Sequence, residues 1–383
     1  MTDLWEKGIE RMLVRVRDTA QRVGTGFPHW ADPESGKWTV TADGDWTGGY
    51  WVAMLVLAYR DTRDESYRER ATKLAFQLRA RIDLASVFKA VPFYYGGSVA
   101  HILLNDPAGR EIALAAAEAL MRLYDPRIAL IPLGQEAEEG SQVGPAESSI
   151  DSLFATPFLQ WAARETGNKR MGEIARNHAA RVIELHLRVD GNFIQSTSLD
   201  PASGAVLRHY THKGYSDRST WARAQAWGVL LSAMSYIRQP DEDQWLDAAQ
   251  RGADWWMAHV PADRIAFWDF DDPGIPSVER DTAATAAMSA GLLKLSAATA
   301  DPIKQLEYRR FAEESVGALV QHYLTPTSAN DRRVAGVLTD GCFNKRSDSR
   351  SQDAATKNEL IFGSYYLFEA LYILAGKLDP RMI

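Results

Sequence analysis

The sequence predicts an all-α fold, an (α/α)6 toroid built from six helical hairpins. First, an apolar helix opened by aromatic or small residues recurs along the chain, with starts near Trp46, Pro92, Asp151, Trp221, Asp281 and Glu359. Second, a more polar amphipathic helix follows all but the last of these segments, as in ESYRERATKLAFQLRARI. Repeats of this size indicate stacked helix pairs rather than a mixed sheet fold.

The six apolar segments are expected to form the inner helices. In chain order they read DWTGGYWVAMLVLAY, VPFYYGGSVAHILL, DSLFATPFLQWAAR, WARAQAWGVLLSAM, DTAATAAMSAGLLKL and ELIFGSYYLFEALYIL. Each is apolar nearly all round, as expected of a buried helix, whereas the helices between them have one polar face. The amphipathic N-terminal segment LWEKGIERMLVRVRDTAQRV can supply the sixth outer helix. The ends of the inner helices then surround one central cavity, where a functional site is expected.

Length and composition favour a single domain over residues 1–383, because the repeat runs evenly through the chain. The net charge of −7 argues against general nucleic-acid binding. The single cysteine, Cys342, excludes an intrachain disulfide and a cysteine-built metal cluster. No segment has the length of a membrane span and the N-terminus lacks an uninterrupted apolar stretch, so we expect a cytoplasmic protein with no membrane partner. The sequence does not indicate an oligomeric state.

Aromatic residues are the compositional peculiarity, with 12 Trp and 14 Tyr. Many stand at the starts of the inner helices, where they either fill the core or line a cavity for stacking against sugar rings. The loops richest in Gly, Pro and charge cover residues 132–149, 269–280 and 344–359. Each directly precedes an inner helix, so we expect these loops to form the rim of the cavity mouth.

Glu147 and Asp151 are the first candidates for chemistry. If both lie on one helix, their spacing of four residues places them on the same face. Apolar flanks would raise the pKa of Asp151, as a general acid requires. The alternative is helix capping, in which Ser148, Ser149 or Asp151 binds free backbone amides.

The segment HYTHKGYSDRSTWARAQAWG is the densest polar and aromatic stretch. Arg223 within it can bind a carboxylate bidentately, or it can form a buried ion pair with Asp217 or Asp281. Asp281 itself is expected to be the N-cap of the helix that it precedes. His209 and His212 have an H-x-x-H spacing, but no third ligand is apparent, so we do not expect a metal.

Five stretches, in this order, resemble the unsaturated glucuronyl hydrolases of glycoside hydrolase family 88. They are FPHWADPESGKWTVTADGDWTGGYWVAMLVLAY, IDSLFATPFLQWA, HKGYSDRSTWARAQAWG, WDFDDPGIPSVERDTAATA and GSYYLFEAL. The resemblance implies a toroid that acts on oligosaccharides with a C4=C5 double bond in a terminal uronate, without a metal or organic cofactor. It also implies a hydration mechanism, in which an aspartate protonates C4, water adds at C5, and the resulting hemiketal opens. By motif position that aspartate is Asp151.

The resemblance further implies a substrate-binding set, made of Trp46, Tyr50, His212, Trp221, Arg223 and Trp227. The chain departs from the family at VFKAVPFYYGG, which lacks the second aspartate of a His-Asp-Leu-Gly-Phe type segment. We expect the nearby Lys89 to bind the substrate, together with Lys213, which replaces a Gln, and Ser364, which replaces an Asp. We expect the missing carboxylate to come from Glu147, Glu136 or Glu139. Two alternatives are a conventional glycosidase that pairs Asp151 with Glu147, and a sugar-binding toroid without activity.

Overall fold

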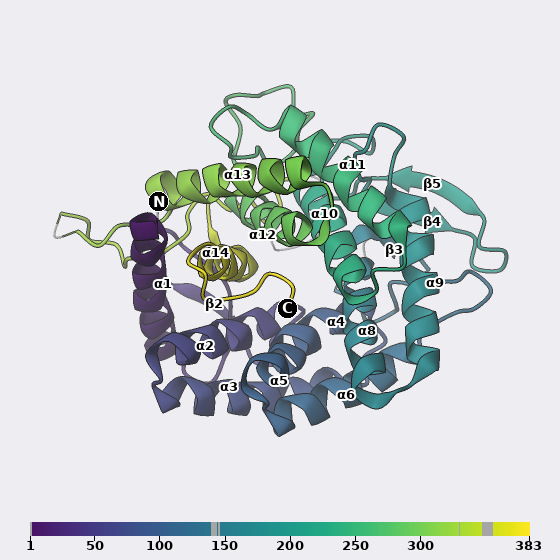
Figure 1. The fold of residues 1–383 in the computed structure, drawn as a ribbon, viewed down its shortest axis with the longest axis horizontal. Coiled ribbons are helices and arrows are strands. Elements are labelled where there is room, and N and C mark those ends of the chain that lie inside the picture. The colour runs from purple at the N-terminus through teal and green to yellow at the C-terminus, as the bar shows by residue number, and fades with distance from the viewer. Residues whose placement is uncertain (1, 139–143, 145, 329, 347–354) are drawn as a thin grey trace.

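The inner helices stand around a common axis in the computed structural model, which describes residues 2–138, 144, 146–328, 330–346 and 355–383 (Figure 1). They are α2 (Gly48–Thr62), the interrupted helix α4 (Ala90–Phe93), η3 (Tyr94–Ser98) and α5 (Val99–Leu104), then α8 (Ala155–Thr166), α10 (Ala222–Arg238), α12 (Thr282–Ala298) and α14 (Ile361–Leu374). Their side chains are buried almost throughout, and every residue from Thr282 to Leu295 in α12 is buried. This burial follows from their apolar character on all sides.

The outer helices cover this ring and expose one polar face each. They are α1 (Thr2–Arg22), α3 (Glu65–Gln77), α6 (Pro107–Met121), α9 (Lys169–His186), α11 (Asp243–His259) and α13 (Pro302–Ala318). Within the described residues, six inner and six outer helices alternate along the chain, so the predicted (α/α)6 toroid is confirmed. No helix in these ranges combines the length and apolar character needed to cross a bilayer.

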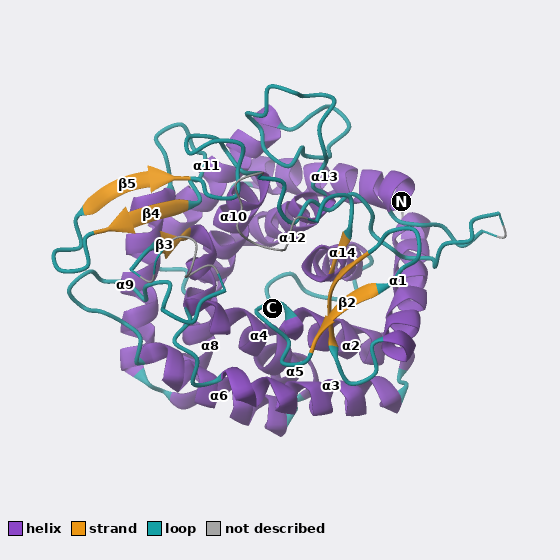
Figure 2. Ribbon diagram, turned by 180° about the vertical axis from the view of Figure 1, so that it is seen from behind, coloured by secondary structure: helices purple, strands orange, loops and turns teal. Residues whose placement is uncertain are grey.

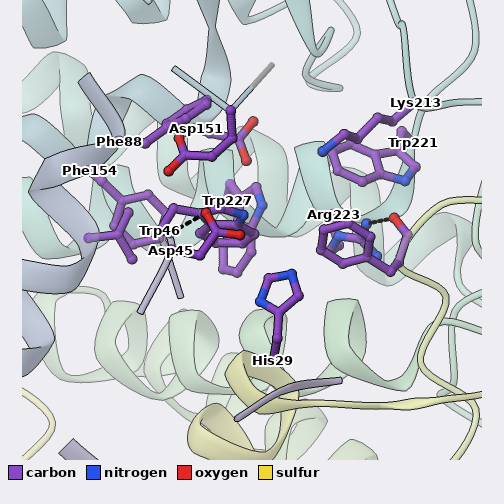
Figure 3. Close-up of a pocket in the computed structure, with 13 residues that line it drawn as sticks. His29, Asp45, Trp46, Phe88, Asp151, Phe154, Lys213, Trp221, Arg223 and Trp227 are labelled. Carbon is purple, nitrogen blue, oxygen red and sulfur yellow. Dashed lines mark hydrogen bonds between the residues drawn. The ribbon is translucent and has the colours of Figure 1, made fainter. Parts of the chain in front are cut away.

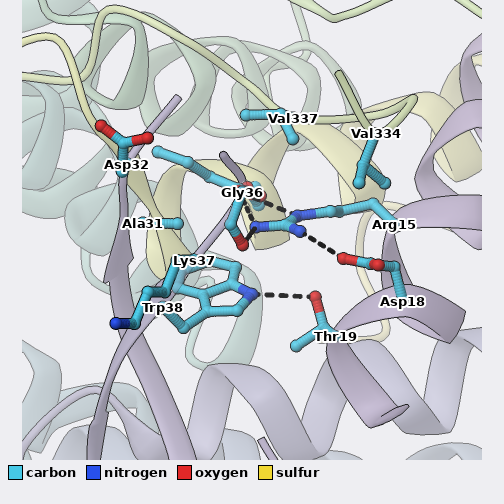
Figure 4. Close-up of polar contacts among 12 residues, drawn as sticks. Arg15, Asp18, Thr19, Ala31, Asp32, Gly36, Lys37, Trp38, Val334 and Val337 are labelled. Carbon is cyan, nitrogen blue, oxygen red and sulfur yellow. Dashed lines mark hydrogen bonds and ion pairs between the residues drawn. The ribbon is translucent and has the colours of Figure 1, made fainter. Parts of the chain in front are cut away.

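The N-terminal helix closes the ring, as predicted, because α1 packs against the last inner helix, α14. Arg15 of α1 is fully buried, and its Nη2 lies 2.5 Å from Oε2 of Glu359, just before α14. The same guanidinium binds Asp18 at 2.8 Å and the backbone carbonyl of Gly36 at 3.2 Å (Figure 4). One buried cation therefore joins the two ends of the chain.

Two small antiparallel sheets are the main departure from the all-α prediction (Figure 2). One has the order β2-β1-β6, with β1 (Phe27–Ala31), β2 (Trp38–Thr41) and β6 (Glu359–Leu360); the other has the order β3-β4-β5, with β3 (Ser148–Ser149), β4 (Ser196–Leu199) and β5 (Val206–Tyr210). β3 and β6 directly precede η4 (Ile150–Phe154) and α14. The sheets therefore support the starts of inner helices, where the cavity lies.

Candidate active site

A cavity lies among the N-terminal ends of the inner helices, where the repeat predicted it. It encloses about 690 Å³, part of it open to solvent. Its lining residues are His29, Asp45, Trp46, Phe88, Val91, Glu138, Asp151, Phe154, Lys213, Trp221, Arg223, Trp227 and Phe343 (Figure 3). Aromatic rings thus form much of the wall, and the charged groups come from loops, from η4 and from the start of α10. This combination suits a sugar, whose ring faces are apolar and whose edges need hydrogen bonds.

Asp151 faces this cavity from η4, a 3-10 turn that leads into α8 (Figure 3). Its Oδ2 accepts a hydrogen bond of 2.7 Å from the hydroxyl of Ser149. Ser149 is the N-cap residue of η4, but its side chain makes no capping bond. The arrangement therefore orients the Asp151 carboxyl toward the cavity instead of using it for helix capping.

Two buried histidines of α9 hold the backbone around Asp151. His178 Nδ1 accepts from the Ile131 amide at 3.1 Å and its Nε2 donates to the Ser152 carbonyl at 2.9 Å. His186 Nδ1 lies 2.8 Å from the Ile194 carbonyl, and its Nε2 lies 2.9 Å from the Ser148 hydroxyl. Burial lowers the pKa of His178 to about 4 and that of His186 to about 3. Both rings are therefore neutral at pH 7, and the hydrogen bond from the Ile131 amide requires this form of His178.

Glu147 does not share a helical face with Asp151, so the predicted geometry of this pair is wrong. The intervening Ser148 and Ser149 form strand β3, which pairs with β4. Glu147 is buried beside β5, where it accepts a hydrogen bond of 3.0 Å from the Tyr210 hydroxyl, and it is not among the described lining residues. Glu136 instead binds the backbone amide of Ala85, at 2.7 Å.

Glu139, the third candidate for the missing carboxylate, lies outside the described residues.

Arg223 is held by protein groups, which favours the ion-pair alternative over bidentate binding of a substrate carboxylate. Its Nη1 lies 2.5 Å from Oδ2 of Asp281, and Nη1 and Nη2 also donate to the carbonyls of Cys342 and Phe343. Asp281 in turn caps α12, as predicted, by accepting from the Ala284 amide at 3.2 Å. Arg223 therefore forms part of the cavity wall with its donors directed largely at the protein.

Lys213 is the better-placed cation. Its Nζ lies 5.2 Å from the ring centroid of Phe343 and 5.9 Å from that of Trp221. It lies across the cavity from Asp151 (Figure 3). Lys89, by contrast, donates to the Ile82 carbonyl at 2.5 Å, and it is not among the described lining residues. The prediction that Lys89 contacts substrate is therefore not supported by its position.

Three other predicted binding residues also lie away from the described cavity wall. Tyr50 is buried with its hydroxyl 3.2 Å from that of Tyr366, and Ser364 donates to Glu359 at 2.8 Å. His212 Nδ1 lies 2.8 Å from the hydroxyl of Ser196. Of the predicted set, Trp46, Lys213, Trp221, Arg223 and Trp227 do line the cavity.

The histidines of the H-x-x-H spacing bind hydroxyls of strand β4. His209 Nδ1 lies 2.9 Å from Thr197 Oγ1, next to the His212–Ser196 contact. Among the described residues, no group of three His, Cys, Asp or Glu side chains is placed to hold a metal ion.

Sequence reasoning missed His29, Asp45, Glu138 and Phe343 in the cavity wall. Glu138 Oε1 binds Nη2 of Arg81, and burial, together with the charge of Asp45, raises the pKa of Glu138 to about 8. His29 enters from strand β1, with Nδ1 2.6 Å from Thr47 Oγ1. The sequence does contain a feature that points to Glu138, because this residue belongs to the acid-rich loop 132–149, which is predicted to form part of the cavity rim.

Proteins of known activity resemble the chain along nearly its whole length. An unsaturated glucuronyl hydrolase from Bacillus sp. (strain GL1) is 32% identical over 380 residues, which cover 96% of each chain. An unsaturated chondroitin disaccharide hydrolase from Streptococcus agalactiae serotype III (strain NEM316) is 27% identical over 96% of this chain and 90% of that protein. A solved unsaturated glucuronyl hydrolase variant with dGlcA-Glc-Rha-Glc has a TM-score of 0.88 and 30% identity, covering 97% of this chain and 96% of that one. No protein-family model matches the chain.

Proposed function

Because this chain belongs to the unsaturated glucuronyl hydrolase family of glycoside hydrolases, we propose that its cavity binds the terminal unsaturated uronate of an oligosaccharide and hydrates the C4=C5 bond. The observation that carries this proposal is the position of Asp151. Its carboxyl faces a cavity walled by Trp46, Trp221 and Trp227, and Lys213 lies across that cavity (Figure 3).

Asp151 acts as both general acid and general base in the proposed reaction. Its carboxyl gives a proton to C4 while a water oxygen bonds to C5, and the resulting carboxylate takes a proton from that water. The C4=C5 double bond is consumed, C4 gains hydrogen and C5 gains a hydroxyl. The product is a hemiketal at C5, whose ring opens and releases the partner sugar. The hydrogen bond from Ser149 orients the Asp151 carboxyl for these transfers.

The walls of the cavity supply binding without chemistry. The tryptophan rings can stack on the apolar faces of the sugars, and the ammonium of Lys213 can pair with the uronate carboxylate. Arg223 is paired with Asp281, so its guanidinium is largely occupied by protein groups and not by the ligand. These contacts favour an anionic sugar in the cavity over a neutral one.

A panel of lyase-generated unsaturated disaccharides tests this proposal through loss of absorbance of the conjugated double bond. The wild-type protein should consume at least one member, and Asp151→Asn should lose about 10²–10⁴-fold in kcat, the usual contribution of general acid–base catalysis. Asp190→Asn, a matched change at an exposed aspartate, should leave kcat unaltered. An Asp151→Asn variant that keeps more than about a tenth of the wild-type rate would exclude this role.

The two alternative functions give different results in the same assay. Hydrolysis of saturated glycosides, with unsaturated ones untouched, would indicate a conventional glycosidase, which needs carboxyls on both sides of the scissile bond. Binding of unsaturated disaccharides in calorimetry without any turnover would indicate a sugar-binding toroid.

A further inference from the structure

The second inner helix gives the cavity only apolar side chains. Phe88 and Val91 line the wall from the segment VFKAVPFYY, which contains no acid. Three carboxyls nevertheless reach the cavity among the described residues, from Asp45, Glu138 and Asp151. Asp45 belongs to the loop between β2 and α2, and Glu138 to the loop that precedes β3. The chain therefore places additional acids in the cavity from positions outside the inner helices.

Arg81 fixes the position of Glu138. This buried arginine lies in η1 (Leu78–Arg81), binds Asp43 Oδ2 at 2.5 Å through Nη1 and binds Glu138 Oε1 through Nη2. It therefore connects the loop that carries Asp45 to the loop that carries Glu138. The side chain of Glu138 is only 21% exposed, so its carboxyl is held close to the wall.

The other oxygen of Glu138 has no donor. Oε2 is buried and has no hydrogen-bond partner among the described residues, while the carboxyl of Asp45 lies within hydrogen-bonding range of Glu138. Two carboxylates can hydrogen-bond only when one of them carries a proton. A buried carboxyl oxygen without a donor, next to a second carboxyl, favours the protonated form of Glu138, while Arg81 neutralises the charge of the neighbouring Asp43.

We propose that Glu138 is the second carboxyl group of this active site, held protonated beside Asp45, where it donates a hydrogen bond to a hydroxyl of the terminal uronate. The proposal rests on the function proposed above. It assigns to a loop residue the acid that the second inner helix lacks. A neutral carboxyl both donates and accepts, which matches a sugar hydroxyl.

Charge balance in the cavity supports the protonated form. Glu138 faces Asp45 and Arg81, and Arg81 also binds Asp43. The other charged side chains of the described wall are Asp151, Lys213 and Arg223, and Arg223 is paired with Asp281. Three ionised carboxylates would repel an incoming uronate, and a shared proton removes one of these charges. Burial first, and the charge of Asp45 second, raise the pKa of Glu138 to about 8. Above this pH the site gains a negative charge, so KM for a uronate should rise.

Infrared spectroscopy of the ligand-free protein tests the shared proton without any assumption about the substrate. The C=O stretch of a protonated carboxyl should be present at pH 7, disappear as the pH passes about 8, and be missing in Glu138→Gln. In Asp45→Asn it should disappear at lower pH, because one cause of the raised pKa is gone. Glu118→Gln, on the exposed face of α6, should retain the wild-type band. Identical spectra for the wild type and Glu138→Gln at pH 7 would overturn the proposal, even for a protein that turned over no substrate in the panel.

Steady-state kinetics then test the role in binding. With an unsaturated disaccharide, the wild-type KM should rise above pH 8, and Glu138→Gln should remove this rise while retaining most of kcat/KM at pH 7, because a carboxamide still donates. Glu138→Ala should lower kcat/KM by about tenfold or more, through the loss of a hydrogen bond in an enclosed site. An alkaline rise in KM that persists in Glu138→Gln would also overturn the proposal. Thermal melting of each variant shows that it is folded.

Discussion

Lys213 and Arg223 show how two neighbouring cations can have different roles at the scale of single residues. Arg223 is nearly fully buried and gives its donors to Asp281 and to two backbone carbonyls. Lys213 lies over the rings of Phe343 and Trp221 at the cavity wall. Removing Arg223 should therefore damage the fold, whereas removing Lys213 should damage the binding of an anion.

Lys213→Gln should raise KM for an unsaturated uronyl disaccharide by about tenfold or more, since a hydrogen bond to a charged group contributes about 1.5–3 kcal/mol. The KM for the methyl ester of the same disaccharide should change little, because the ester has no charge to pair.

Arg223→Ala should instead lower the free energy of unfolding by about 3–5 kcal/mol, because it leaves Asp281 buried and unpaired.

The matched control is Lys169→Gln, at an exposed position of α9, which should alter neither KM nor stability. Equal increases in KM for the acid and the ester in Lys213→Gln would contradict a role in charge recognition. A normal melting temperature for Arg223→Ala would contradict its structural role.

The residue scale also separates what the sequence could predict from what it could not. Trp46, Asp151 and Trp227 stand at the starts of inner helices, and the repeat alone places such positions around the axis. Tyr50 and Ser364 also lie near helix starts, but their hydroxyls contact Tyr366 and Glu359 in the core, which the position in the repeat does not reveal. Glu138 reaches the cavity through a loop whose path depends on Arg81, a contact across 57 positions that no local pattern reveals.

At the scale of elements, helix α9 works as a support for the turn that carries Asp151. His178 bridges the Ile131 amide and the Ser152 carbonyl, and His186 links Ser148 to Ile194. Both rings are fully buried, so protonating either one costs free energy, and in His178 it removes the nitrogen that accepts from the Ile131 amide. The geometry of the proposed catalytic turn is therefore coupled to the neutral state of these two side chains.

Stability should consequently fall on mild acidification. In the unfolded chain a histidine titrates near pH 6.5, whereas the folded pKa of His178 is about 4, so the unfolded state binds more protons between these values. The contribution of His178 is complete above pH 6.5 and is lost as the pH falls to about 4. The free energy of unfolding should drop by about 1.4 kcal/mol per pH unit for each buried histidine in this window.

Urea unfolding at a series of pH values measures this slope. His178→Gln should reduce the slope of the unfolding free energy against pH by the amount that corresponds to about one proton, whatever its effect on stability at pH 7. His259→Gln, which changes an exposed histidine of α11, should leave the slope unaltered. A wild-type slope that persists in His178→Gln would show that other groups cause the acid sensitivity.

The elements themselves were predictable to different degrees. The inner and outer helices follow from periodicity, because burial on all sides or on one side is a local property of the sequence. The strands were missed because they are short: β3 has two residues and pairs with the distant strand β4, by Cα partners such as Ser148 and Thr197. This omission produced the wrong geometry for Glu147, since a strand lies where a helix was expected.

At the scale of the whole molecule, a toroid must join its first and last elements. Here the contact between the chain ends is polar as well as apolar, because Arg15 of α1 binds Glu359 of β6, 344 positions away, and both side chains are buried. The Arg15 guanidinium also lies 4.7 Å from the ring centroid of Trp38 on β2 (Figure 4). The inner-helix start after Glu359 is therefore set by a contact between the two chain ends.

Breaking this contact should destabilise the entire ring. Arg15→Leu leaves the Glu359 carboxylate buried without its cation, which should cost about 3–5 kcal/mol of unfolding free energy. The double variant Arg15→Leu, Glu359→Leu removes both charges and should recover a large part of that loss, because no uncompensated charge remains. The control Arg22→Ala breaks the pair with Asp18 on the solvent side of α1, and it should cost no more than about 1 kcal/mol.

Urea unfolding of the wild type and the three variants, followed by circular dichroism, measures these differences. A double variant that is no more stable than Arg15→Leu would show that the unpaired charge of Glu359 does not cause the loss of stability.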